Sequence, residues 1–289
     1  MSKKRGTMMI RSNSADDPQK TMRRMINHFV YPLAVVVMGL FVLVGCSDDN
    51  DDVLPPGDDT PVKVYDIDGN EYKTVIIGDQ VWMAENLRVT RYNNEDDIPT
   101  GLSNAEWQNT TSGAYAIYNN DDNMLQAYGK LYNWYAVHDS RGLCPEGWSV
   151  PSDGDWTVLA NYVVRQGFPN EWDHPNGAGN ALKSCRQVGH PDGGDCDTSE
   201  HPRWNSHGTH SGFDEFGFSA LPGGRRWSDG SFDFVGDLGH YWSATEGSGT
   251  NAWNRNMKSN YGNLNRGSYR KAHGFSIRCL RDIVRTEDE

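Results

Sequence analysis

Short apolar runs divided by tight-turn signals limit most strongly what this chain can fold into. Residues 62–65, 72–77 and 80–83 have the length and composition of β-strands, and turns rich in Asp, Gly and Asn separate them at 66–70 and 78–79. Glycine and asparagine adopt the backbone angles that hairpin turns need. This part of the chain is therefore predicted to form consecutive β-hairpins.

The first of these turns also carries oxygen-bearing side chains at alternate positions, Asp66, Asp68 and Asn70. A calcium loop of the helix–loop–helix type has such a pattern, but it needs glycine at its sixth position and glutamate at its twelfth. This sequence has Glu71 and Ile77 at those positions. The turn interpretation is therefore preferred over a calcium site.

One helix is signalled clearly, at about 152–164. Ser152 is followed three residues later by Asp155 and then by an apolar run, which is the pattern of a capping box. Residues 167–211 are rich in Gly, Pro and His and are predicted to be a long loop with a short helix near 178–184. Further strands are expected at 113–118, 129–137, 217–221, 232–234, 240–244, 252–257 and 275–280. The body is predicted to be one α+β domain of mostly short antiparallel strands.

The N-terminal segment has a different composition. Seven Lys and Arg side chains precede an uncharged run of 17 residues, 29–45, which is slightly shorter than a membrane-spanning helix of about 20 residues. A positive segment followed by an apolar run is the pattern of an export signal. Met22 or Met25 would make a more ordinary start for such a signal than Met1 does.

The apolar run ends in Leu-Val-Gly-Cys, residues 43–46, which resembles the lipobox of bacterial lipoproteins. The resemblance implies a signal peptide over 1–45 and lipidation of Cys46, where buried acyl chains contribute about 0.8 kcal/mol per methylene group. The alternative is an uncleaved signal anchor with a coincidental cysteine.

An acidic segment follows the lipobox. Residues 46–61 contain six Asp and three Pro, so we expect a disordered tether. Such a segment also resembles the surface-export signal of Bacteroidetes lipoproteins, and this resemblance implies attachment to the outer membrane with the domain facing the exterior. A plain spacer is the alternative interpretation.

Charge and composition limit the classes of molecule that this chain is expected to bind. The formal net charge is −12, and the 20 basic and 37 acidic side chains that follow residue 45 give that part −17. Binding to a phosphate backbone needs clustered Lys and Arg, so nucleic acid is not expected as a partner. All ten Trp lie beyond residue 80, which supplies ample apolar area for a packed core.

Seven stretches in order resemble the Fibrobacter succinogenes major paralogous domain. They are VYDIDGNEYKTV (64–75), WMAENL (82–87), GKLYNWYA (129–136), CPEGWSVP (144–151), GFSALPGG (217–224), YWSATE (241–246) and SIRCLRD (276–282). The resemblance covers a domain at 62–282 and leaves a charged tail at 283–289. It implies a C-type-lectin-like fold, related to the formylglycine-generating-enzyme branch, on a surface lipoprotein.

Four cysteines remain beyond Cys46, an even number that suits disulfides in an oxidising compartment and allows three pairings. In lectin-like folds a disulfide ties the helix to the final strand, so the resemblance implies Cys144 with Cys279, and then Cys185 with Cys196. The alternative is a metal site that uses Cys185 and Cys196 with histidines. Its candidate ligands are His190, His201, His207 and His210. Their spacing is looser than in known zinc sites, and neither a metal ion nor a cofactor is expected.

Catalysis has little support in the sequence. Enzymes of the formylglycine-generating branch use two nearby cysteines close to the C-terminus, and this chain has Cys279 alone there. A G-x-S-x-G turn, a phosphate-binding glycine loop and H-E-x-x-H are also missing. Asp214, Glu215 and Glu246 are interpreted as loop and strand-end charges rather than as a glycosidase pair. The chain is therefore not expected to be an enzyme.

Binding through loops is the preferred hypothesis. The candidate loops are 167–211 and 247–267, and the tripeptides with which calcium-dependent animal lectins hold sugars are missing. Candidate ligand-binding residues are Trp172, Trp204, Trp227 and Tyr261, with Arg225 and Arg226 after a Gly-Gly turn for an acidic sugar or carboxylate. Each of these aromatic side chains has packing as its alternative role. The expected function is capture of extracellular glycan or another polymer; the alternatives are a structural protein that contacts envelope proteins and, third, an enzyme.

Overall fold

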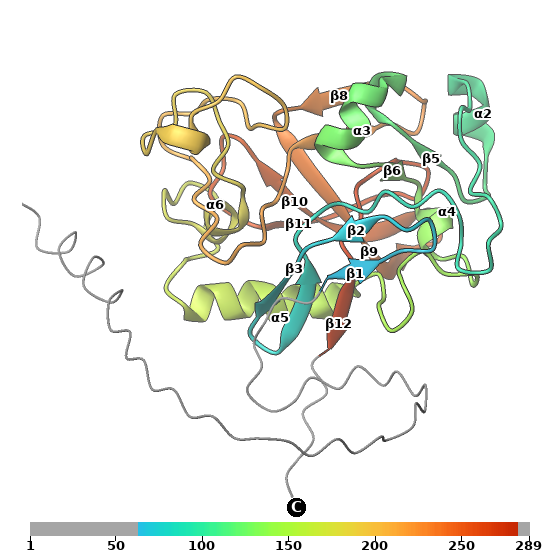
Figure 1. Cartoon of the computed structure of the whole chain (residues 1–289), viewed down its shortest axis with the longest axis horizontal. Helices are drawn as coiled ribbons and strands as arrows, with labels where there is room; N and C mark the ends of the chain where they lie inside the picture. The colour runs from blue at the N-terminus through green and yellow to red at the C-terminus, as the bar shows by residue number, and fades with distance from the viewer. Residues whose placement is uncertain (1–62, 283–289) are drawn as a thin grey trace, which may run out of the picture. The chain divides into compact units, whose positions relative to one another are not determined.

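The computed structural model describes residues 63–282, which form a mixed α+β domain made mostly of short strands (Figure 1). Cys46, the tether at 46–61 and the tail at 283–289 lie outside the described residues. Among residues 63–282, no helix has the length and apolar character needed to cross a membrane. The predicted fold class is therefore confirmed at the level of α+β.

The largest sheet has five strands in the order β11-β10-β9-β7-β8. Its strands are β7 (Gly223–Arg226), β8 (Phe232–Val235), β9 (Leu238–Ser248), β10 (Asn251–Lys258) and β11 (Asn265–Arg270). Neighbours pair antiparallel except β7 and β9, which are parallel. The β9–β10–β11 meander occupies most of the region 247–267 that was expected to be a binding loop, so that prediction is wrong, whereas the strand expected at 252–257 is confirmed within β10.

The remaining strands form three small sheets. The N-terminal hairpin of β3 (Thr74–Ile77) and β4 (Gln80–Met83) pairs with β12 (Leu280–Asp282), so it joins both ends of the described chain. Two short pairs complete the set, β1 (Val64–Tyr65) with β2 (Glu71–Tyr72) and β5 (Tyr115–Ala116) with β6 (Leu131–Tyr132).

Both predicted hairpin turns are confirmed. In the β1–β2 turn, the carboxylate of Asp66 accepts hydrogen bonds from the backbone N–H groups of Asp68 and Asn70 at 3.0 and 2.9 Å. It also accepts from the Tyr72 hydroxyl at 2.6 Å. The acidic side chain therefore stabilises the turn by satisfying backbone donors, as Asp commonly does.

The predicted helix is confirmed as α5 (Asp153–Arg165). The Ser152 hydroxyl accepts from Asp155 N at 3.1 Å, and the Asp155 carboxylate accepts from Ser152 N at 2.7 Å, so both halves of the capping box are formed. The short helix expected near 178–184 is present as α6 (Ala178–Leu182), and the 3₁₀ turn η2 (Gly194–Cys196) follows in the long loop.

Several other assignments differ from the sequence predictions. Within 129–137 only β6 is a strand, because the Asn133 side chain accepts from Ala136 N and starts the helix α4 (Trp134–Val137). The strand expected at 113–118 is limited to β5 and is followed by the 3₁₀ turn η1 (Tyr118–Asn120). Residues 217–221 form no strand, since Gly217 and Ser219 have φ values of 69° and 50°.

Two helices were not predicted. The helix α2 (Asn104–Asn109) begins with a capping box between Ser103 and Glu106, a signal that the sequence does contain. The helix α3 (Asp122–Tyr128) ends at Gly129, whose φ of 73° is unfavourable for other residues. Both are short, which explains why hydrophobic periodicity did not reveal them.

The core joins α5 to both larger sheets. The rings of Trp82 on β4 and Trp156 on α5 lie 4.7 Å apart, and Trp156 also contacts Tyr241 on β9 at 5.9 Å. Phe218 packs against Trp82, Trp156 and Tyr241 from the loop before β7. This contact set holds the helix against the sheets and leaves the long loops with α6 and η2 at one end of the domain (Figure 1).

Both expected disulfides are present. Cys144 is bonded to Cys279, which ties the segment before α5 to the segment before β12, and Cys185 is bonded to Cys196 within the long loop. The thiols proposed as metal ligands are therefore consumed in a disulfide, and the metal alternative that used Cys185 and Cys196 is wrong. The pairing prediction is confirmed.

Candidate functional site

A cleft of about 230 Å³ lies where the β10–β11 connection meets the loop that follows α5. We call it the Trp172 cleft. It is lined by two aromatic side chains and three asparagines: Trp172, Asn256, Tyr261, Asn263 and Asn265. Because the two segments are separated by more than 80 residues of sequence, only the folded chain forms this site.

The aromatic residues of the cleft stand at right angles. The ring centres of Trp172 and Tyr261 are 5.7 Å apart with an angle of 88° between their planes, and we call this pair the aromatic corner. Trp172 is 62% exposed, an unusual exposure for so large an apolar side chain. A ring-shaped ligand could therefore pack against one face while the other ring limits it at the side.

Backbone contacts between the two loops fix the aromatic corner. The Gly262 N–H donates to the carbonyl oxygen of Trp172 at 2.7 Å, and the Asn170 side chain accepts from Leu264 N at 2.8 Å. A Cβ atom at Gly262 would overlap the carbonyl oxygen of His174. Glycine is therefore required at position 262 for the close approach that places Tyr261 beside Trp172.

A buried lysine holds the same segment from beneath. Lys183 Nζ donates to the carbonyl oxygens of Lys258, Tyr261 and His210 at 2.9, 3.2 and 3.1 Å. Burial lowers the pKa of Lys183 to about 7, and the negative charge of Asp237 opposes this effect by favouring the ammonium form. The backbone beneath Tyr261 is thus fixed by three donors of a single side chain.

A chain of amide side chains leads from the cleft along the sheet. Asn265 Nδ2 donates to Asn256 Oδ1 at 3.4 Å, and Asn256 Nδ2 donates to Asn254 Oδ1 at 3.3 Å. Asn254 Oδ1 also lies 3.4 Å from His240 Nδ1, within hydrogen-bond distance. Burial lowers the pKa of His240 to about 3, which keeps the imidazole neutral. These side chains share a face because they alternate along β10 or lie opposite each other across strand pairs.

Asn263 differs from the other amides of the cleft. Its Oδ1 atom is buried and has no hydrogen-bond partner among residues 63–282. Leaving such an acceptor unpaired costs about 1–3 kcal/mol, so unpaired buried groups are rare in folded proteins. Asn263 therefore lines the cleft with a side chain whose buried acceptor is unused among the described residues.

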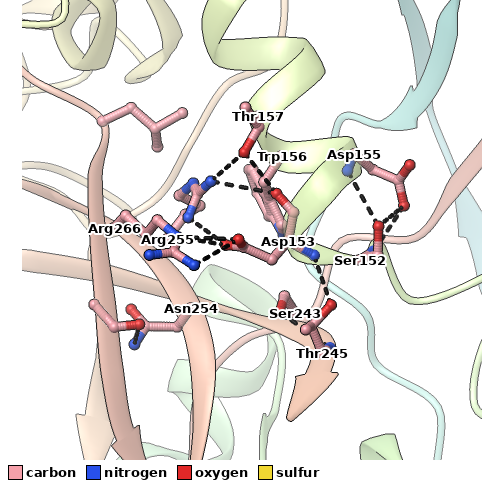
Figure 2. A network of polar contacts seen from close by, with 12 residues as sticks. Ser152, Asp153, Asp155, Trp156, Thr157, Ser243, Thr245, Asn254, Arg255 and Arg266 are labelled. Atoms are coloured by element: carbon pink, nitrogen blue, oxygen red, sulfur yellow. Dashed lines mark hydrogen bonds and ion pairs between the residues drawn. The ribbon is translucent and has the colours of Figure 1, made fainter. Parts of the chain in front are cut away.

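The opposite face of the same strands is occupied by α5 (Figure 2). The Asp153 carboxylate accepts from Arg255 Nη1 at 2.6 Å and from Arg266 Nε at 3.0 Å. Burial alone would raise the pKa of Asp153, but the guanidinium groups of Arg266 and Arg255 outweigh it and lower the pKa. This network fixes the helix N-terminus to β10 and β11, so its charges are used within the fold.

The structure brings together two of the predicted binding residues, Trp172 and Tyr261. Trp204 is buried, with Nε1 donating to Ala220 O at 3.1 Å, so it cannot contact a ligand and that prediction is wrong. Trp227 lies apart from the cleft, half-buried, with its Nε1 donating to Asp233 at 2.6 Å. The expected set of four ligand-binding aromatics is therefore not a single surface.

Arg225 and Arg226 were expected to follow a Gly-Gly turn. In the structure, both belong to strand β7 together with the two glycines. Both are buried: Arg225 pairs with Asp233 at 3.1 Å, and Arg226 donates to Gly230 O at 3.0 Å. Their guanidinium groups also stack on rings, Arg225 on Trp227 at 3.5 Å and Arg226 on Trp107 at 4.3 Å. The prediction that this pair recognises an acidic ligand is therefore wrong, since both side chains are buried within the fold.

Sequence reasoning missed the three asparagines of the cleft. Asn254 and Asn256 are two residues apart, a spacing that places side chains on one face of a strand. The strand predicted at 252–257 contains both residues, so the signal was available, but only aromatic and arginine side chains had been selected as candidate ligand contacts.

A larger cavity of about 590 Å³ lies beside the β1–β2 hairpin, and both acidic and basic side chains line it. Its cations already have partners: Arg91 pairs with Asp68 at 2.7 Å and Arg88 with Glu85 at 2.9 Å. Lys130 is buried there, and burial lowers its pKa to about 8. Because Arg88 and Arg91 are paired with carboxylates and Lys130 donates to the carbonyl oxygen of Arg88, the Trp172 cleft is the better candidate for a ligand site.

Comparison with known proteins agrees with the ordered motifs. Residues 75–281 match the Fibrobacter succinogenes major domain, which is most of the described chain. No curated protein and no solved structure matches the chain, so the C-type-lectin-like fold stays a prediction. The match covers well over half of the sequence, and the chain therefore belongs to the Fibrobacter succinogenes major domain family.

Proposed function

We propose that this protein is a lipid-anchored surface protein whose domain binds extracellular glycan at the Trp172 cleft. The observation that carries the proposal is the aromatic corner, an exposed tryptophan held at 88° to a tyrosine beside three asparagines. Aromatic faces pack against the C–H groups of sugar rings, and amides can both donate to and accept from hydroxyl groups. The combination suits a saccharide.

The site supports binding rather than catalysis. Cys279 is bonded to Cys144, so the C-terminal thiol that a formylglycine-generating mechanism would use is not free. No carboxylate lines the Trp172 cleft, whereas hydrolysis of a glycosidic bond commonly uses two. A binding module without catalytic activity therefore agrees best with these side chains.

Replacing Trp172 with alanine should weaken glycan binding by at least about tenfold, which corresponds to about 1.4 kcal/mol. The side chain is 62% exposed, so its loss leaves little cavity and the unfolding midpoint should change little. The measurement is retention of the full-length protein, with both disulfides formed, on immobilised glycans and insoluble polysaccharides, with and without EDTA. Tyr65→Ala, which removes another exposed aromatic ring, is the matched control and should bind normally.

Two outcomes would count against this assignment. Equal losses for Trp172→Ala and Tyr65→Ala would show that the cleft is not the glycan site. No retention of the folded wild-type protein on any glycan would favour the alternative of an assembly protein that contacts other envelope proteins. Binding lost in EDTA would instead point to a metal-dependent site.

The proposed location depends on Cys46, which follows the lipobox-like residues 43–45. Cys46→Ser removes the thiol that acylation needs, so the variant should lose labelling by a radioactive or alkyne-bearing fatty acid and leave the membrane fraction. Cell-surface protease accessibility of the wild-type protein tests the exterior orientation. Persistent membrane attachment of the unlabelled variant would instead support an uncleaved signal anchor.

A further inference from the structure

We infer that the Trp172 cleft holds one uncharged sugar residue at the end of a glycan, and that Asn263 Oδ1 accepts a hydrogen bond from that residue. This inference rests on the proposed function and specifies the class of saccharide. It follows from three properties of the cleft: its shape, its lack of charge, and its unpaired acceptor.

The shape of the cleft favours a chain end. Trp172 and Tyr261 are nearly perpendicular, at 88°, so they form a corner rather than the flat aromatic surface on which an extended polysaccharide could lie. The volume of about 230 Å³ is also below the ~300–1,000 Å³ of pockets for drug-sized ligands. A single pyranose ring can pack on one aromatic face while the second ring blocks continuation of the glycan in that direction.

The charge distribution favours a neutral residue. The lining consists of two aromatic rings and three amides, and no carboxylate, ammonium or guanidinium group belongs to it. Lys258 Nζ lies 5.3 Å from the centre of the Tyr261 ring but does not line the cleft. The chain as a whole has a formal net charge of −12, so an acidic polysaccharide would meet long-range repulsion, and no cationic side chain lines the cleft to offset it.

The unpaired acceptor identifies the polar contact. Asn256 Oδ1 accepts a hydrogen bond from Asn265 Nδ2 at 3.4 Å, whereas Asn263 Oδ1 has no partner among the described residues. A sugar hydroxyl or the N–H of an acetamido group supplies the missing donor.

The test is a competition assay with the full-length protein on an immobilised glycan that it retains. The probes are neutral methyl hexosides and methyl N-acetylhexosaminides, matched linear oligosaccharides of increasing length, and oligosaccharides of uronic acids. We expect a neutral methyl glycoside to displace the protein, affinity to stay constant as residues are added to the oligosaccharide, and uronic acids not to compete.

Asn263→Ala provides a second readout. It should weaken glycan binding about tenfold, the effect of losing one hydrogen bond. The same variant should leave the unfolding midpoint unchanged or higher, because it removes an unsatisfied buried atom. Asn170→Ala is the control: its side chain brackets Leu264 through two hydrogen bonds, at 2.8 and 3.2 Å, so it should lower the midpoint.

The outcomes separate this inference from the function on which it rests. Affinity that rises with each added sugar residue, or a preference for uronic acids, would overturn the end-binding inference while Trp172-dependent glycan binding stands. Normal affinity in Asn263→Ala would overturn the role of its amide oxygen. Failure of every glycan to bind would remove the proposed function together with the inference.

Discussion

Replacing Arg278 with methionine should lower the free energy of unfolding by at least about 4 kcal/mol. A loss of this size is typical when a buried polar network is broken. The guanidinium group is fully buried. Its Nε donates to Asn86 Oδ1 at 2.7 Å, and its two Nη atoms donate to the carbonyl oxygens of Met83, Phe218 and Ser219. Methionine fills similar space but leaves these acceptors without their donor, each at a cost of about 1–3 kcal/mol.

The measurement for Arg278→Met is urea unfolding followed by tryptophan fluorescence. Arg278→Lys should lose less stability than Arg278→Met but still be strongly destabilised. The reason is that an ammonium group cannot reproduce the planar arrangement of donors in a guanidinium group. Arg270→Met is the matched control, since Arg270 is exposed on β11 and should change stability by no more than about 0.5 kcal/mol. A midpoint for Arg278→Met equal to that of the control would show that the buried network contributes nothing to stability.

Removing the Cys144–Cys279 disulfide should cost about 5 kcal/mol, and removing Cys185–Cys196 should cost about 3 kcal/mol, on the chain-entropy account. The difference arises because the first bond closes a separation of 135 residues and the second closes only 11. A longer closed loop removes more conformations from the unfolded chain. The long-range disulfide also ties the segment before α5 to the segment before β12.

Each disulfide is tested by replacing both of its cysteines with alanine and measuring the unfolding midpoint under oxidising conditions. The two double variants control for each other because each loses one sulfur–sulfur bond. Equal losses, or a larger loss for the short loop, would contradict the entropy argument and indicate that local strain or packing decides. The Cys185→Ala/Cys196→Ala variant should also retain glycan, since neither cysteine lines the Trp172 cleft.

Local signals were sufficient for the elements whose contacts lie close together in sequence. The two N-terminal hairpins follow from turn residues, and α5 follows from the capping box of Ser152 and Asp155. The predictions failed for several short helices and strands. A four-residue helix such as α4 replaces a predicted strand because one asparagine cap and the tertiary packing outweigh the strand propensity of its Tyr and Trp residues.

Part of the candidate site could be predicted from the sequence. Trp172 and Tyr261 were identified as loop aromatics, but nothing in their spacing shows that they are 5.7 Å apart. Trp204 has similar Asn- and Gly-containing surroundings in sequence and is buried. The difference is decided by Lys183 and Ala220, which contact Trp204 from distant positions, while no described segment covers Trp172.

Sequence motifs alone predict the family, the α+β class, the N-terminal turns, the capped helix and an even number of cysteines beyond Cys46. Each depends on motifs or on interactions within a few residues. Tertiary structure alone decided which tryptophans are exposed, where the arginines find partners, and how residues near 172 and 261 form one cleft. The physical reason is that burial and polar satisfaction depend on groups from remote segments, which local sequence does not specify.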